Sequence, residues 1–564
     1  MKHPGKKFRA LAAALGVSCA AMLASSPSRA YCRYYSTTPP AWDPVSSGGC
    51  YQGGSGGGDY LLFWAGLCAG YSIQQDASLY VTLADATTLA AEAFAAWSAA
   101  QCSQGGSPSI QAVNVGTAAC SNVQYNQYQP NQNVIIFRDD GWPSDEDHDP
   151  GNLALTTVQY YNDTDSADDP QNGQILGADM EVNESNFRLV ADPSTFDAGS
   201  GGVDVYPLLP VLMHEAGHFL GLAHSADENA LMYAFYHASS AAGLTQDDSE
   251  GICATALPGG LRLTTNAGVV DTGAVCDPTP TNGFQSECGD PDAAALATGD
   301  DGGAEAGAGD NSDSAALDTG GCSVGASSAR SRWFGAVATC ALGIVLAMRR
   351  LARRRRRSAA VVVLLALATL GTALPMARDA TASTSVEVTF EELVHSATAV
   401  AVITPIELHA ARESGRAVTH VRAKVASLIA GSLPDEIVVR TLGGVVDRIG
   451  EIVEGQASFA VDQPVLVFVR PSKSEPGQFA VVALAQGQFP VVTGPDAKVR
   501  IVGGPNPGAL VPPGAHRLEW LSKILPPGAT PRPARALLAE RTLEDVRRLV
   551  VSSWDRLHRH LGGD

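Results

Sequence analysis

The chain has 564 residues, of which 45% are hydrophobic, and it carries a formal net charge of −20 at pH 7. This length is too great for one hydrophobic core and predicts two or three domains joined by connectors. The acidic balance argues against a nucleic-acid partner, because phosphate binding needs Lys and Arg clustered on a folded face.

Residues 1–30 have the three parts of a signal peptide. Basic residues precede an apolar run over 10–24, and the sequence Ser-Arg-Ala ends the segment, which predicts cleavage before Tyr31. Lipoprotein processing at Cys19 is an alternative, but Val17 and Ser18 fit that motif poorly. The sequence therefore predicts an exported protein that is extracellular or held at the cell surface by a membrane anchor.

Cysteines recur between residues 31 and 321, at Cys32, Cys50, Cys68, Cys102, Cys120, Cys253, Cys276 and Cys288. An even number of cysteines in a chain that passes through an oxidising compartment predicts disulfides. Cys102 with Cys120, and Cys276 with Cys288, are attractive local pairs, while other connectivities remain open. None of these cysteines has CxxC spacing, so metal binding by them is not favoured.

After an N-terminal Cys-containing segment over 31–67, residues 68–256 have the pattern of an α+β domain. An Ala-rich stretch over 88–97 predicts a helix, and the β-branched runs over 133–137 and 153–161 predict strands.

Residues 214–224 read HEAGHFLGLAH and match HExxHxxGxxH at every specified position. On a helix, His214 and His218 leave the same face one turn apart and can hold one ion. Glu215 is placed to take a proton from metal-bound water rather than to bind the metal. Gly221 can adopt the left-handed conformation that ends a helix, so that His224 arrives as the third ligand. Three protein ligands leave a fourth position for water, which is typical of a catalytic zinc site.

The short form HExxH also arises by chance on helices, but the longer form is far more specific. Met232 lies eight residues beyond His224, where metzincins place their Met-turn. With Ser225 directly after His224, the arrangement resembles the matrixin branch of the metzincins. The resemblance covers roughly residues 68–256. Within that range, 88–97 is similar to the first long helix of the family, 175–183 to the strand before the active-site helix, and 243–253 to the C-terminal helix.

The resemblance implies a zinc peptidase domain with a mixed twisted sheet and an active-site helix. It implies zinc held by His214, His218 and His224, above the turn that contains Met232. Glu215 would act as general base and then deliver the proton to the leaving amine. The implied substrates are proteins or peptides. The alternative is a catalytically idle metzincin-fold surface protein that binds partners through its C-terminal β-domain.

The sequence carries fewer signals for three further properties: cleavage specificity, calcium binding and latency. By family analogy an extended substrate would pair with the strand over 153–161, and 234–237 would give the pocket apolar and aromatic walls. Calcium could bind the acidic turn, although a solvated turn explains it equally well; its carboxylates are Asp163, Asp165, Asp168 and Asp169. The PRCGxPD cysteine switch of vertebrate matrixins does not occur before residue 68.

Residues 257–321 predict a Cys-containing segment followed by an acidic disordered linker, because 289–321 has too little apolar surface to fold. Residues 322–357 combine Cys322, an apolar span over 333–348 and an Arg cluster. In that order they resemble the C-terminal sorting tail of myxobacterial surface proteins.

Residues 358–382 contain a second apolar run over 358–377, which is long enough to span a bilayer. The positive-inside rule would then place the Arg cluster between the two spans in the cytoplasm and both flanking domains outside. The same run also has the pattern of an internal signal peptide, so a fusion of two secreted proteins remains open.

Residues 383–510 contain short β-rich runs separated by Gly, Pro, Asp and Ser, which predict a small antiparallel barrel or sandwich. Residues 511–564 predict a Pro-containing segment and a helix over 542–557. The predicted fold class is therefore α+β, with a metzincin catalytic domain, two apolar membrane segments and a small β-barrel or sandwich at the C-terminal end.

Overall fold

The computed structural model describes residues 31–37, 42, 44, 47, 49–54, 58–139, 142, 148–192, 203–233, 243–273, 275–289, 385–504, 510–511, 513–525 and 530–558. The described residues before 290 and after 384 belong to one structural unit. The predictions for the signal peptide, the acidic linker over 290–321, the sorting tail and residues 358–382 lie outside the described residues, as does the expected pocket wall over 234–237.

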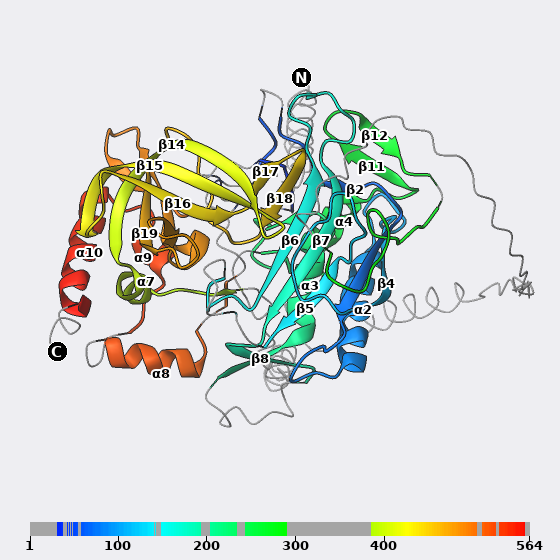
Figure 1. The fold of residues 1–564 in the computed structure, drawn as a ribbon, viewed down its shortest axis with the longest axis horizontal. Coiled ribbons are helices and arrows are strands. Elements are labelled where there is room, and N and C mark those ends of the chain that lie inside the picture. The colour runs from blue at the N-terminus through cyan, green and yellow to red at the C-terminus, as the bar shows by residue number, and fades with distance from the viewer. Residues whose placement is uncertain are drawn as a thin grey trace, which may run out of the picture. The chain divides into compact units, whose positions relative to one another are not determined.

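Five strands of an eight-stranded mixed sheet organise the N-terminal half (Figure 1). Their order is β4 (Gln111–Ala118), β3 (Cys68–Gln74), β5 (Val134–Arg138), β7 (Gln174–Asn183) and β6 (Ala154–Tyr161). The pairs β3–β4, β3–β5 and β5–β7 are parallel, whereas β6 runs antiparallel to β7. The central strands are buried almost throughout, as expected for a sheet that is covered by other elements.

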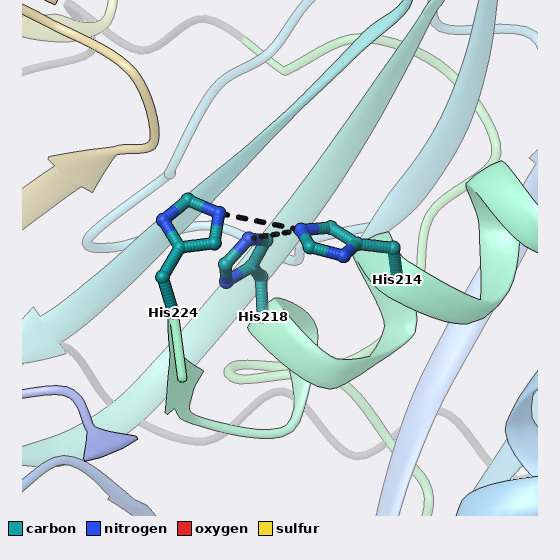
Figure 2. Close-up of side chains that lie close together, drawn as sticks. All are labelled: His214, His218 and His224. Carbon is teal, nitrogen blue, oxygen red and sulfur yellow. Dashed lines mark hydrogen bonds between the residues drawn. The ribbon is translucent and has the colours of Figure 1, made fainter. Parts of the chain in front are cut away.

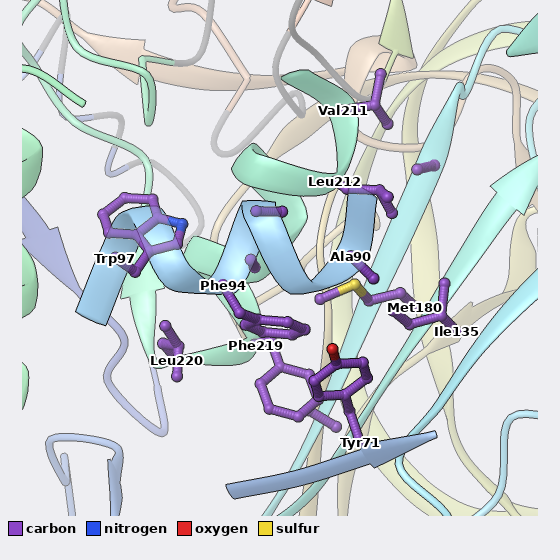
Figure 3. Close-up of a cluster of buried hydrophobic side chains, with 14 of the residues drawn as sticks. Tyr71, Ala90, Phe94, Trp97, Ile135, Met180, Val211, Leu212, Phe219 and Leu220 are labelled. Atoms are coloured by element: carbon purple, nitrogen blue, oxygen red, sulfur yellow. The ribbon is translucent and has the colours of Figure 1, made fainter. Parts of the chain in front are cut away.

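Two helices, α2 (Leu83–Ser98) and α3 (Leu208–Phe219), share one hydrophobic core with this sheet. Figure 3 shows the rings of Tyr71, Phe94 and Phe219 packed together in this core. Thr82 caps α2 by accepting a hydrogen bond from the Asp85 amide. The indole of Trp97 donates to the carbonyl of Met213 at 2.8 Å, which fixes α3 against α2 next to the predicted zinc ligands.

Smaller elements complete this half. Helix α4 (Gln246–Thr255) begins with a capping box at Thr245. The short strands are β1 (Cys32–Arg33), β2 (Phe63–Trp64), β8 (Phe187–Val190), β9 (Asp204–Pro207), β10 (Leu222–Ala223), β11 (Leu261–Thr264) and β12 (Gly268–Asp271).

Four disulfides connect the eight cysteines, and the two local pairs expected from the sequence are wrong. The bonds are Cys32–Cys50, Cys68–Cys276, Cys102–Cys253 and Cys120–Cys288. Cys102 and Cys120 lie beyond opposite ends of β4, a strand of eight residues. At roughly 3.3 Å per residue that strand separates them far beyond disulfide reach. Cys32 and Cys50 are 18 residues apart, whereas the other three bonds join cysteines that are 151 to 208 residues apart in the sequence.

The C-terminal part contains a closed β-barrel, which decides between the barrel and the sandwich. Its ring runs through β14 (Ala399–Glu413), β15 (Arg416–Gly431), β16 (Glu436–Leu442), β20 (Phe479–Val481) and β19 (Val465–Pro471), and the pairing of β19 with β14 closes it. The strands β21 (Gln488–Thr493) and β22 (Val499–Ile501) continue from β19.

Three helices pack against one face of the barrel strands. Helices α7 (Phe390–Ser396), α9 (Ala534–Leu538) and α10 (Leu543–His558) share a hydrophobic core with residues of β14 and β19. The remaining elements are β13 (Ser385–Val386), η5 (Leu484–Gly487), β23 (Leu510–Val511) and α8 (Ala515–Ile524). A hairpin of β17 (Gly444–Val446) and β18 (Ile449–Val453) leaves the barrel and joins the N-terminal sheet beside β6.

The two membrane segments of the predicted fold class require correction. In the part of the chain that the structure describes, no helix is long and apolar enough to cross a bilayer. The expected spans over 333–348 and 358–377 lie outside that part. The described fold is instead mixed α/β, with a metzincin-like catalytic domain and a C-terminal β-barrel. The expectation rested on local hydropathy, which gives the length of an apolar run but not the fold that contains it.

Candidate metal centre and active site

Helix α3 and the turn after it bring the three predicted ligands together (Figure 2). His214 and His218 lie on the last two turns of the helix, and His224 follows the short strand β10. Gly221 has a φ of +96°, which places it in the left-handed region expected from its role in turning the chain. Its amide donates to the His218 carbonyl at 2.9 Å and closes the end of the helix.

The three imidazoles face one point with their Nε2 atoms. Nε2 of His214 lies 3.0 Å from Nε2 of His218 and 3.3 Å from Nε2 of His224. Nitrogens bound to one tetrahedral zinc ion at about 2.0–2.1 Å stand roughly 3.3 Å apart. Among the described residues, this triad is the one group of at least three His, Cys, Asp or Glu side chains whose ligand atoms lie close enough together to hold a metal ion. The donor set and its spacing fit Zn²⁺.

The Nδ1 atom of each ligand has its own partner. Nδ1 of His214 is 2.8 Å from the carbonyl of Leu231, and Nδ1 of His218 is 2.9 Å from the carbonyl of Leu222. Nδ1 of His224 lies 2.9 Å from Oε1 of Glu454. Such partners fix the orientation of a ring and leave Nε2 free for the metal.

Burial keeps the rings of His214 and His218 neutral, which is the form that binds metal. It lowers the pKa of His218 to about 4, although Glu454 opposes that change. It also holds the pKa of His214 well below its usual value, and the two neighbouring imidazoles add to this effect. These two imidazoles are therefore ready to bind a cation without first releasing a proton.

Glu215 is completely buried beside the triad. The Thr156 hydroxyl on β6 donates to Oε2 of Glu215, whereas Oε1 is buried without a hydrogen-bond partner. Burial raises the pKa of Glu215 to about 8, with the Thr156 bond opposing and Glu454 adding to the rise. A buried carboxylate oxygen that lacks a donor is suited to accept a proton from a bound water.

Met232 lies under the ligand helix, as the Met-turn interpretation requires. A Cβ atom on Gly217, between His214 and His218, would overlap the Met232 sulfur and the ring of Trp97. The Asp248 carboxylate accepts from the amide of Met232 at 3.0 Å and from the preceding amide at 2.8 Å. The turn is thus held by α4 and packs directly against the helix that carries the ligands.

We expect Gly217→Val to destabilise this centre. The valine side chain would have to displace Met232 or Trp97 from a fully packed core, and overpacking of this kind costs about 1–3 kcal/mol or more. Thermal unfolding should occur at a lower temperature than in the wild-type chain, with a lower zinc content. Gly268→Val is a useful comparison, because a Cβ there meets nothing within 4 Å and only its positive φ is disturbed. Equal loss in both variants would contradict the packing argument.

Three residues of the centre were not predicted from the sequence: Tyr34, Thr156 and Glu454. The Tyr34 hydroxyl lies 2.8 Å from Nδ1 of His218 and donates to Oε2 of Glu454. Tyr34 comes from the N-terminal Cys-containing segment, and Glu454 follows β18 in the C-terminal part. No motif marks any of the three, since only the tertiary fold brings them to α3.

The acidic turn over 163–169 forms a separate feature on the N-terminal half. Asp163 accepts from the Asp165 amide at 3.0 Å and lies 3.5 Å from Arg448, while Asp169 accepts from the Tyr161 hydroxyl. These contacts account for the turn through local hydrogen bonds, and calcium binding there stays a prediction.

Comparison with known proteins agrees with this geometry. Residues 125–255 match the model of the family described as matrixin. The match is confined to this stretch. It contains the three histidines of the triad, Glu215 and Met232.

Proteins similar to part of this chain include interstitial collagenases and a viral protein. The chain is 46% identical over 72 residues to an interstitial collagenase of Bos taurus, which covers 13% of this chain and 15% of that protein. It is 34% identical over 97 residues to a probable matrix metalloproteinase of Invertebrate iridescent virus 3, which covers 17% and 21%. An interstitial collagenase of Equus caballus is 51% identical over 87 residues, which covers 14% and 15%. The chain thus spans about a fifth or less of the length of these relatives.

Proposed function

We propose that this protein is an exported zinc endopeptidase that hydrolyses peptide bonds in protein substrates. The observation that carries the proposal is the buried His214, His218 and His224 triad with the Glu215 carboxylate beside it. The match to the matrixin family supports the same activity. The four disulfides support an oxidising location outside the cytoplasm.

The residues of the centre divide the chemistry between them. Zn²⁺ held by the three imidazoles would supply a Lewis acid that polarises the scissile carbonyl and lowers the pKa of water. Glu215 takes a proton from the attacking water through its free Oε1 and then gives that proton to the leaving amine. Thr156 holds the other carboxylate oxygen, so the base keeps one orientation during both transfers.

The substrate would be an extended chain rather than a compact ligand. Strand β6 carries Thr156, which contacts Glu215, so a peptide that pairs along β6 passes the catalytic carboxylate. Addition of a strand to a sheet edge uses main-chain hydrogen bonds and tolerates many sequences. This arrangement supports an endopeptidase.

Metal removal tests this function directly. We expect the purified full-length chain to contain one zinc ion and to cleave casein or gelatin slowly. A chelator should stop the cleavage, and added Zn²⁺ should restore it, because the His triad rather than a cysteine holds the ion. Zinc content measured by atomic spectroscopy, together with release of acid-soluble peptides, checks both points. A zinc-loaded chain that cleaves nothing, even when the site is opened as described below, would favour an idle binding protein.

A further inference from the structure

The edge of β6 is already occupied by another part of the same chain. Strand β18 pairs antiparallel with β6, with Ile449 opposite Tyr161 and Val453 opposite Thr157. Main-chain hydrogen bonds continue on both sides of this pairing. The Asn162 amide donates to the carbonyl of Arg448 at 2.8 Å, and the Glu454 amide donates to the carbonyl of Thr156 at 3.2 Å. An extended substrate could not form these bonds while β18 is in place.

The end of this strand enters the catalytic centre. Glu454 is 2% exposed, and its carboxylate contacts Nδ1 of His224 and the hydroxyl of Tyr34. His214, His218 and Glu215 are fully buried, and His224 is 3% exposed. A peptidase that acts on protein chains must open this centre to a long substrate, so the described arrangement is a closed one.

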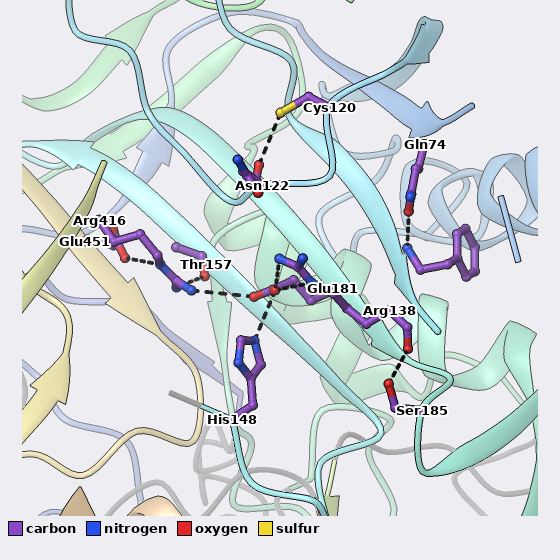
Figure 4. A network of polar contacts seen from close by, with 11 residues as sticks. Gln74, Cys120, Asn122, Arg138, His148, Thr157, Glu181, Ser185, Arg416 and Glu451 are labelled. Atoms are coloured by element: carbon purple, nitrogen blue, oxygen red, sulfur yellow. Dashed lines mark hydrogen bonds and ion pairs between the residues drawn. The ribbon is translucent and has the colours of Figure 1, made fainter. Parts of the chain in front are cut away.

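A buried charge cluster holds the hairpin against the N-terminal sheet (Figure 4). Arg416 on β15 lies 3.3 Å from Glu451 on β18 and donates to the Thr157 hydroxyl on β6 at 3.0 Å. It also lies 3.7 Å from Glu181 on β7. Burial alone would raise the pKa of Glu181, but His148, Arg138 and Arg416 together lower it below its usual range. The cluster therefore pairs the positive charge of Arg416, on a barrel strand, with the negative charge of Glu181, on the N-terminal sheet.

The shape of the hairpin also matches β6. Gly450 lies opposite Tyr160, and a Cβ atom at Gly450 would overlap the tyrosine ring. The turn residues Asp447 and Arg448 both have positive φ, which suits a tight two-residue hairpin turn. The hairpin thus presents a residue without a side chain where the sheet offers no space for one.

We propose that residues 444–454 are an internal occupant of the substrate-binding edge and that they keep the full-length chain latent. This inference rests on the proposed peptidase function, because only a peptide-binding edge can be blocked in this way. An occupant within the same chain competes at an effective concentration on the order of millimolar, without a separate inhibitor. Displacement of the hairpin would free the edge of β6 and uncover His224 together.

The first test alters the occupant and leaves the surface intact. Val at position 450 should not fit against Tyr160, so Gly450→Val should release the hairpin. The probe is a fluorescent synthetic peptide of residues 443–456, which retains the glycine. We expect it to bind Gly450→Val at least about tenfold more tightly than the wild-type chain, because apparent affinity falls with the fraction of open protein. Equal affinity in two chains with the same thermal stability would overturn the proposal.

The second test weakens the charge cluster and has a matched control. Arg416→Met leaves Glu451 buried without its cation, which should raise the rate of casein cleavage by at least about tenfold. Arg422→Met is the control, because Arg422 lies on the same strand but pairs with the exposed Glu407 and Glu436 of the barrel. Its rate should equal that of the wild-type chain. Equal rates in all three chains with full zinc content would contradict latency.

The two tests separate this inference from the proposed function. If no variant cleaves casein although each contains zinc, the peptidase assignment fails. The peptide-binding assay still decides whether residues 444–454 occupy the edge of β6, because it does not depend on catalysis.

Discussion

Glu215→Gln is expected to abolish peptide hydrolysis while zinc stays bound. Glutamine keeps the size of the side chain and can still accept the Thr156 hydrogen bond, but it cannot take a proton from water. Loss of a general base typically lowers the rate by about 10²–10⁴-fold. The three His ligands are unchanged, so zinc content should remain that of the wild-type chain.

The measurement needs a variant in which the site is open and a control substitution at a carboxylate outside the site. Casein cleavage and zinc content should be compared in the wild-type chain and in Gly450→Val, each with and without Glu215→Gln. Glu92→Gln on the exposed face of α2 provides the control, and it should change neither quantity. Undiminished cleavage in the Glu215→Gln chains would exclude Glu215 as the base, whereas loss of zinc would show that it supports the ligands instead.

The convergence of the three candidate metal ligands could be predicted from the sequence because these residues are local. His214, His218 and His224 lie within one helix, one glycine turn and one short strand, so their spacing alone brings them together. The elements that carry or support the centre were also close to the prediction. The helix expected over 88–97 is part of α2, and the strands expected over 153–161 and 175–183 correspond to β6 and β7.

The partners of those ligands could not be predicted in the same way. Tyr34 and Glu454 are separated from His218 and His224 by 184 and 230 residues, and nothing in their local sequence marks them. The predicted pairing of Cys102 with Cys120 was wrong for the same reason. A short sequence separation does not show whether two cysteines lie at the same end of a strand or at opposite ends. The sequence predicted a β-rich C-terminal domain, but it gave no sign that one of its hairpins pairs with the N-terminal sheet.

His224→Ala is expected to remove most of the bound zinc. Two imidazoles at i and i+4 remain, and the third corner of the triad becomes an apolar gap next to the buried carboxylate of Glu454. Loss of an outer partner of a zinc ligand typically lowers metal affinity by about 10–100-fold, and loss of the ligand itself should exceed that range. Competition with a chromophoric chelator measures this affinity for the variant and for the wild-type chain.

Tyr34→Phe separates the role of a ligand from that of a supporting residue. It removes the hydroxyl beside Nδ1 of His218 and leaves all three Nε2 atoms in place, and His218 retains the carbonyl of Leu222 as a partner. We therefore expect a smaller loss of affinity, at most about 10–100-fold, and nearly full zinc content when zinc is in excess. If His224→Ala binds zinc as tightly as Tyr34→Phe does, His224 is not the third ligand, and the carboxylate of Glu454 becomes the candidate for that position because it lies next to the same site.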